Sequence, residues 1–177
     1  KRTLETNGYL FALAGISHST LEPGTPLFEI DGTLVLAGDA PVPPDEWVHV
    51  AVVYSENFDR ARLFVDGMFI EEAAPPSMKQ NDSRLFFGRD ALLNSEQEPR
   101  YSFTGFMDEI RVSNTVRYVA DFTPQEVFAY DSATDGDATL FLWHLDGSGS
   151  VIIDAAGNHH AALEGEAVFT DVTICDE

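Results

Sequence analysis

Two adjacent acids, Asp108 and Glu109, come nearest in this sequence to a hydrolytic pair. Glycoside hydrolysis needs two carboxyl groups that flank the scissile bond, one acting as acid and the other as base or nucleophile. Successive side chains of a strand point to opposite faces, so these two acids cannot face one substrate together. The sequence also contains no nucleophile elbow and no glycine-rich phosphate loop before a helix. We therefore expect that the protein is not an enzyme.

Asp108 suggests a different chemistry. On a strand it shares one face with Phe106, Ile110 and Val112. A carboxylate on an apolar face must be paired, hydrogen-bonded or bound to a metal. The chain has thirty Asp and Glu residues against ten Lys and Arg, and Ca²⁺ takes oxygen ligands. These observations favour a calcium ligand at Asp108.

The loop at residues 154–158 offers further oxygen ligands. It supplies the carboxylate of Asp154, the amide oxygen of Asn158 and a glycine that permits a tight turn. We predict a structural Ca²⁺ site with Asp108 and Asp154 as side-chain ligands, and with Asn158 contributing through its side chain or backbone. The alternative is a network of hydrogen bonds at the same place without a metal.

Aromatic and histidine side chains have structural explanations beside functional ones. Trp143 and Tyr101 are candidates for stacking on a sugar ring, but Phe141, Trp143 and Leu145 share one strand face, which favours a core position. His49 lies within a predicted strand and is interpreted as a core histidine. The pair His159-His160 is interpreted as surface, because a zinc site would need further ligands.

The charge balance limits the partners. The net charge is −20 at pH 7, so the chain would repel nucleic acid phosphates and an anionic membrane surface. No apolar run reaches the length of a membrane span. The single cysteine, Cys175, excludes an internal disulfide and leaves pairing outside this chain or a free thiol.

Short apolar runs separated by turn residues predict an all-β fold, either a sandwich of two packed sheets or a barrel. Asp31-Gly32 and Asp66-Gly67 are two-residue hairpin signals. Residues 46–54 carry apolar side chains on both faces, as in a central strand, and residues 123–127 predict one helical turn. The other predicted strands are residues 8–15, 28–30, 33–36, 61–65, 68–70, 84–87, 103–112, 139–145 and 161–169. The predicted core comprises Trp47, Val53, Leu63, Val65, Phe86, Ile110, Val112, Leu140 and Leu142.

Two stretches resemble the laminin-G-like branch of the concanavalin-A-like jelly-roll superfamily of lectins and glucanases. Residues 46–54 with 62–67 are similar to its pattern "W-x-H-V-A … L-x-V-D-G", and residues 86–89 with 103–113 to "I-G-R … F-x-G-x-I-D-E-V-R-I". The resemblance implies a two-sheet antiparallel jelly-roll sandwich. It also implies an ion near the sandwich rim, which ties a loop to the strand with the "D-E-I-R" acid. The fold does not specify a ligand.

The tail resembles a segment that opens the domain in many relatives. Residues 140–158 are similar to "L-W-x-F-D-x-G-S-G … D-x-S-G-N", whereas the first strand of the family pattern is not visible. We predict a single domain over residues 1–177 that lacks this first strand, with residues 139–169 returning to the sandwich. A sheet edge near the N-terminus would then be open to pairing with another chain, reinforced by Cys175.

The predicted function is recognition or adhesion outside the cell, by a secreted or cell-surface module that binds glycans or surface and matrix proteins. The alternative from another class is a structural building block of a surface layer, matrix or filament without a soluble ligand. A glycosidase is the third possibility. A glycan array separates the first two, and an assay on polysaccharides tests the third.

Overall fold

The computed structural model describes residues 9–14, 20–30, 33–55, 57–76, 85–88, 103–135, 138–157 and 159–170. The chain divides into two compact units. The first unit comprises Lys1–Thr104 and Tyr118–Pro124, and the second comprises Gly105–Arg117 and Gln125–Glu177. All regular elements of the described residues are antiparallel strands, which confirms the all-β prediction. Among these residues no helix has the length and apolar character that a membrane span requires.

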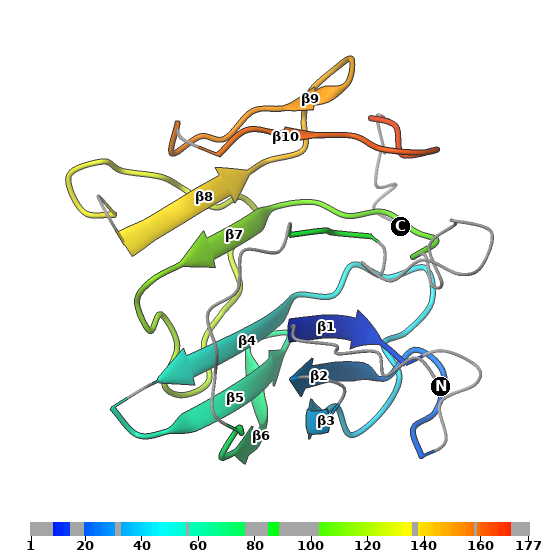
Figure 1. The fold of residues 1–177 in the computed structure, drawn as a ribbon, viewed down its shortest axis with the longest axis vertical. Helices are drawn as coiled ribbons and strands as arrows, with labels where there is room; N and C mark the ends of the chain where they lie inside the picture. Colours follow the sequence, from blue (N-terminus) through cyan, green and yellow to red (C-terminus); the bar gives the residue numbers. More distant parts are fainter. Residues whose placement is uncertain are drawn as a thin grey trace, which may run out of the picture. The chain divides into compact units, whose positions relative to one another are not determined.

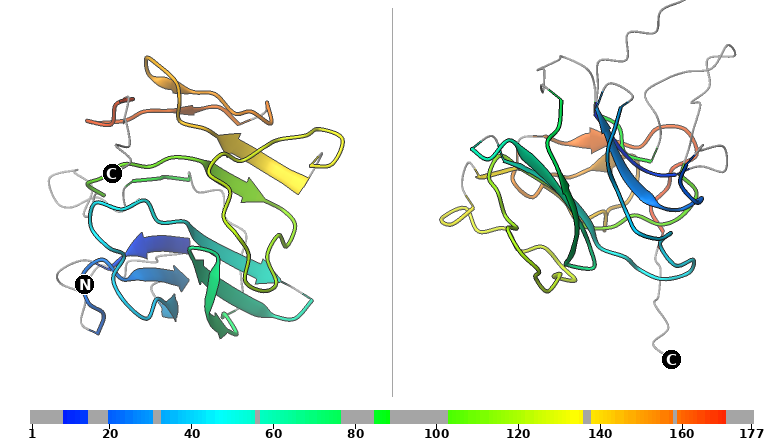
Figure 2. Two further views of the ribbon diagram at one scale, coloured as in Figure 1. Left: turned by 180° about the vertical axis from the view of Figure 1, so that it is seen from behind. Right: turned by 90° about the horizontal axis from the view of Figure 1, so that it is seen from below.

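The first unit contains two three-stranded sheets (Figure 1). One sheet has the order β1-β2-β3, formed by Tyr9–Leu13, Pro26–Ile30 and Thr33–Ala37. The other has the order β4-β5-β6, formed by Val50–Ser55, Arg60–Val65 and Met68–Ala73. The right-hand view of Figure 2 shows these two sheets as separate layers.

The core of the first unit lies between the two sheets. Phe28, Ile30 and Leu36 come from one sheet and Ala61 and Leu63 from the other, and all five are buried in a single cluster. Apolar side chains from both sheets are buried from water at this interface. Burial of apolar surface is the main force that stabilises the packing of two sheets.

Both hairpin signals are confirmed in the first unit. Strands β2 and β3 pair from Ile30↔Thr33, although the connecting residues 31–32 lie outside the described residues. Strands β5 and β6 pair from Val65↔Met68 around Asp66 and Gly67, whose φ angles are 49° and 75°. Two positive φ values belong to the turn that matches the twist of a hairpin.

The Tyr118–Pro124 segment covers the second face of the β4-β5-β6 sheet. The rings of Tyr118 and Phe122 stack at 3.6 Å, and both meet the fully buried Phe64 edge-on. The N–H of Phe122 donates to the carbonyl of Gly67 at 2.9 Å. A Cβ on Gly67 would lie 1.9 Å from the Phe122 oxygen, so this close approach requires glycine.

The second unit contains two two-stranded sheets. Strand β7 (Ile110–Ser113) pairs with β8 (Thr139–Trp143), and β9 (Val151–Ile152) pairs with β10 (Ala161–Ala162). Phe141, Trp143 and Ile152 form its buried cluster, with Ile110 and Val112 packed against it. Residues 139–169 thus supply strands beside β7, while the prediction of a single domain stays a prediction.

Several predicted elements differ from the structure. Residues 46–49 precede β4, and the order β4-β5-β6 places β5 rather than residues 46–54 at the centre. Only Ile110–Ser113 forms a strand within residues 103–113, and residues 123–127 form a bend instead of a helical turn. Residues 85–88 are not a strand. Apolar composition predicted these strands, but a strand also needs a neighbour to accept its hydrogen bonds.

The predicted core was partly wrong. Leu63 and Leu142 are fully buried, but Trp47 is 46% exposed and Leu140 is 41% exposed. The remaining members, Val53, Val65, Phe86, Ile110 and Val112, are half-buried. Leu140 and the fully buried Leu142 share one face of β8, so the period-2 alternation by itself does not decide burial.

Candidate functional site

The first unit has an open, shallow depression beside strand β6. Its volume is about 440 Å³, within the range of small-ligand sites. Six residues line it: Arg62, Phe69, Glu72, Val119, Ala120 and Asp121. Three of them come from strands β5 and β6, and three come from the Tyr118–Pro124 segment.

The wall formed by the Tyr118–Pro124 segment is fixed to β6 by hydrogen bonds. The N–H of Phe69 donates to Oδ1 of Asp121 at 2.8 Å, which links residues 52 positions apart. The guanidinium of Arg62 donates to the carbonyl of Val119 at 3.4 Å. These bonds, with the Phe122–Gly67 bond, position the polar groups of the depression before any ligand arrives.

The depression combines an aromatic face with charged groups. Phe69 is 44% exposed, and its ring meets the buried Phe64 edge-on at 5.9 Å. The guanidinium of Arg62 donates to Glu72 Oε2 at 2.6 Å, and Arg60 lies 3.4 Å from Glu72 Oε1. Glu72 therefore serves two guanidinium groups. An exposed ring flanked by fixed hydrogen-bonding groups is suited to a ligand with one apolar face and polar edges.

A second cluster of polar groups surrounds Glu109 in the second unit. Nδ1 of His144 lies 2.8 Å and 3.1 Å from the two carboxylate oxygens of Glu109. Oε2 of Glu109 also accepts the N–H of Phe128 at 2.8 Å, and the guanidinium of Arg111 lies over the Phe128 ring. Glu109 and Leu145 both have positive φ angles, which non-glycine residues seldom adopt. Glu109 thus ties together three segments of the second unit.

The carboxyl of Asp108 belongs to the same cluster. Partial burial raises its pKa, and the charges of Glu109 and Asp146 add to this effect. The N–H of Glu109, which donates to Oδ1 at 2.9 Å, opposes the rise in pKa. Asp108 precedes β7 and is exposed, and Phe106 is exposed as well, so the predicted apolar strand face around Asp108 was wrong.

A smaller depression of about 260 Å³ lies beside this cluster. His144 and Asp146 line it together with apolar residues, among them Ile153 and Phe169. Nδ1 of His144 faces Glu109, and Nε2 is the other ring nitrogen that could contact a ligand. Sequence reasoning did not single out His144, because the partner that orients it lies 35 residues earlier.

Asp154 is buried and satisfied by backbone groups. Its Oδ1 accepts the N–H of Leu142 at 2.8 Å and that of Ala156 at 2.9 Å. Its Oδ2 accepts the N–H of His159 at 2.8 Å. Asp154 as a whole is only 3% exposed. Each of these charge-assisted bonds is stronger than a neutral one. The carboxylate therefore fixes the loop after β9 to strand β8.

The predicted calcium ligands are placed as follows. Asp108 and Asp154 have separate sets of hydrogen-bond partners, and Asn158 lies outside the described residues. In the part of the chain that the structure describes, no three His, Cys, Asp or Glu side chains gather closely enough to hold a metal. The donors around Asp154 match the hydrogen-bond alternative. The calcium site stays a prediction.

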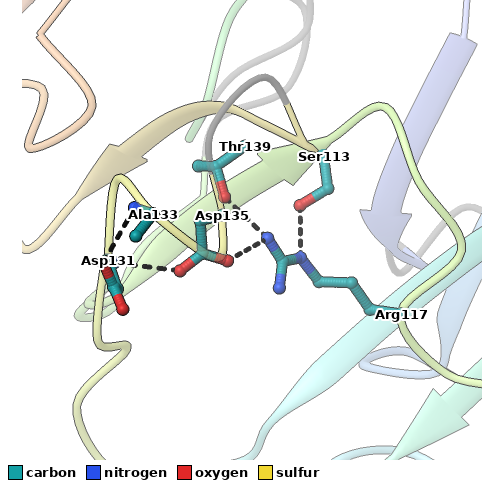
Figure 3. A network of polar contacts seen from close by, with 6 residues as sticks. All are labelled: Ser113, Arg117, Asp131, Ala133, Asp135 and Thr139. Carbon is teal, nitrogen blue, oxygen red and sulfur yellow. Dashed lines mark hydrogen bonds and ion pairs between the residues drawn. The ribbon is translucent and has the colours of Figure 1, made fainter.

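Arg117 lies at the centre of a polar network where β7 ends and β8 begins (Figure 3). Its Nε donates to Ser113 at 2.6 Å, and its Nη2 donates to Thr139 at 2.6 Å and to Asp135 at 2.8 Å. The second oxygen of Asp135 accepts the N–H of Asp131 at 3.0 Å. This N–H bond and the guanidinium together lower the pKa of Asp135.

The remaining candidate residues have structural roles or lie elsewhere. Trp143 is buried, stacks on Phe141 at 4.4 Å and donates its indole N–H to the carbonyl of His159, so it is a core residue rather than a sugar platform. His159 and His160 are exposed, as expected. His49 is half-buried against Phe122. Tyr101 and Cys175 lie outside the described residues.

Comparison with known proteins gives one match. A sequence model described as the concanavalin A-like lectin/glucanases superfamily, of the laminin G type, matches residues 6–122, which is more than half of the chain. No curated protein and no solved structure matches significantly. The match and the antiparallel sheets confirm the predicted jelly-roll sandwich. The chain belongs to the concanavalin A-like lectin/glucanases superfamily, whose domains are in general carbohydrate- or protein-binding modules.

Proposed function

We propose that this chain is an extracellular recognition module that binds glycans through the first-unit depression. The observation that carries the proposal is the exposed ring of Phe69 beside Arg62, Glu72 and Asp121, all held by hydrogen bonds or ion pairs. A pyranose has one apolar face and a rim of hydroxyl groups. The ring of Phe69 can cover the former, and charged groups form strong hydrogen bonds with the latter.

A glycan array followed by titration calorimetry tests this proposal. We expect Phe69→Ala to weaken binding by tenfold or more, since truncation of a central aromatic anchor costs on the order of 1–2 kcal/mol. Met68→Ala is the matched control, because Met68 is an exposed neighbour on β6 that does not line the depression. Equal binding by the wild type and Phe69→Ala, with melting temperatures that show both to be folded, would refute the site.

The module is proposed to be non-catalytic. What supports this is the adjacency of Asp108 and Glu109, together with the engagement of Glu109 by His144 and Phe128. An assay on β-glucans should detect no hydrolysis. Turnover that disappears in Asp108→Asn or Glu109→Gln would instead make the chain a glycosidase.

Pairing with another chain is a further part of the proposal. Within the described residues, β1 and β3 end one sheet of the first unit, and β4 and β6 end the other. Such edges offer unpaired backbone groups to an added strand. Light scattering tests this directly. A monomer at all concentrations, with and without reductant, would exclude pairing through a sheet edge and through Cys175. It would also exclude the alternative function as a structural building block, which requires contacts between chains.

The structural calcium ion at Asp108, Asp154 and Asn158 also remains a proposal. The acidity of the chain and the turn at Gly157, with φ of 94°, support it. The three N–H donors on Asp154 favour hydrogen bonds alone. Calorimetry with and without EGTA separates these explanations, because an ion that binds only the folded state raises the melting temperature. An unchanged melting temperature after chelation would exclude the ion.

A further inference from the structure

The charges around the first-unit depression are unevenly compensated. Glu72 is shared by Arg60 and Arg62, so two guanidinium groups more than balance its single negative charge. Asp121 differs, because only one of its oxygens, Oδ1, accepts a hydrogen bond, and that bond comes from the neutral N–H of Phe69. Oδ2 of Asp121 has no hydrogen-bond or ion-pair partner among the described residues. The depression therefore presents one carboxylate oxygen that has no direct partner among the described residues.

This carboxylate lies beside the exposed ring of Phe69. The N–H bond connects the backbone of Phe69 directly to Asp121, and both residues line the depression. A cation over an aromatic face is attracted by the ring quadrupole, and a carboxylate adds a charge-assisted hydrogen bond. An ammonium group satisfies both partners at once. A sulfate or carboxylate would meet the negative charge of Asp121.

The field of the whole chain acts in the same direction. With a net charge of −20, the protein attracts cationic ligands and repels polyanions. The Arg62 guanidinium is the cation of the depression, and it already donates to Glu72 and Val119. A polyanionic glycan would have to compete with both of these bonds.

We propose that the first-unit depression selects glycans with free amino groups, with the sugar ammonium bound to Oδ2 of Asp121 beside the ring of Phe69. This inference rests on the proposed glycan-binding function and specifies its ligand class. The apolar face of the sugar covers Phe69, and the amino group at its rim gives Oδ2 of Asp121 the direct partner that it lacks.

Titration calorimetry on the full chain tests the inference with a matched pair of ligands. The glucosamine oligomer and the N-acetylglucosamine oligomer of the same length differ only in the charge and bulk of the amino substituent. At a pH where the amine is protonated, we expect the glucosamine oligomer to bind about fivefold more tightly, as for an exposed cation–π contact with a carboxylate. This preference should shrink as salt is added.

Asp121→Asn provides the matched variant. The amide oxygen can still accept the N–H of Phe69, so the wall of the depression stays in place while the negative charge is removed. We expect this variant to bind both oligomers equally and Phe69→Leu to weaken both. A preference that survives in Asp121→Asn would overturn the inference, as would tighter binding of the acetylated oligomer.

Two further ligands separate failure of the inference from failure of the proposed function. Tight, Phe69-dependent binding of a sulfated or uronic-acid oligosaccharide would overturn the amino-sugar inference and leave glycan recognition intact. Binding of a lysine oligomer but of no oligosaccharide would overturn both and indicate a basic protein segment as the ligand.

Discussion

Asp121 and Asp154 are two aspartates of one chain whose surroundings give them opposite uses. Asp154 is buried, and three backbone N–H groups occupy its oxygens. Asp121 is exposed in the first-unit depression, and one N–H holds a single oxygen. A saturated carboxylate stabilises a loop, whereas a carboxylate tethered by one oxygen keeps the other for a ligand. The number of backbone donors, rather than the residue type, separates the structural Asp154 from Asp121, for which we propose a role in recognition.

The largest effect is expected at the buried end of this comparison. Asp154→Ala removes the acceptor of three N–H groups, one in a buried and two in part-buried hydrogen bonds. An unsatisfied buried donor costs about 1–3 kcal/mol and a part-buried one less, so we expect the free energy of unfolding to fall by about 3 kcal/mol. Urea denaturation measures the loss. Asp154→Asn keeps one acceptor oxygen and should lie between Ala and the wild type; if both variants were as stable as the wild type, Asp154 would have no structural role.

The network of Arg117 extends the comparison to a partly buried ion pair. Arg117→Ala removes three donated bonds and leaves Asp135 with the N–H of Asp131. We expect a loss of about 2 kcal/mol in the free energy of unfolding, since the pair is only partly shielded from solvent. Arg117→Lys keeps the positive charge but lacks the planar guanidinium that donates to several acceptors. This variant should therefore regain less than half of the unfolding free energy that Arg117→Ala loses. Full recovery by lysine would show that charge alone matters.

Acidification sharpens the contrast between Asp135 and Asp108. The folded-state pKa of Asp135 is lowered, so its contribution to stability is present above the ordinary value of about 3.9 and is lost as the pH falls through the lowered pKa. Asp108 has a raised pKa, so its ionisation works against folding above the ordinary value. In urea titrations at several pH values, Asp135→Asn should lose less stability on acidification than the wild type. Asp108→Asn should be no less stable than the wild type at pH 7.

The smallest stability effect is expected at Asp121. Asp121→Asn keeps an acceptor for Phe69 and changes only an exposed charge, so the free energy of unfolding should change by no more than about 0.5 kcal/mol. The variant should nevertheless lose the preference for amino sugars. A stability loss comparable to that of Asp154→Ala would show that Asp121 is a structural residue, and the comparison between the two aspartates would fail.

The sequence by itself determined the class of fold and many of its local features. Alternating apolar residues and the Asp66-Gly67 turn act over a few positions, so they predicted the hairpins and most strands of the first unit. Leu63 and the Phe141–Trp143 face were identified as core for the same reason. Residues 103–109 show the limit of such patterns, because their apolar side chains resemble a strand but pair with no strand of the described residues.

Only the tertiary structure decided which polar residues meet. Asp121 joins Phe69 across 52 positions, and His144 joins Glu109 across 35. The periodicity of apolar residues cannot predict such pairs, because the path of the chain between the two partners decides whether they meet. Trp47, predicted as core, is exposed, while Phe64 on the central strand β5 is fully buried. Burial depends on what covers each face, and for Phe64 the cover is the Tyr118–Pro124 segment, whose place on the sheet is fixed by the close approach of Phe122 to Gly67.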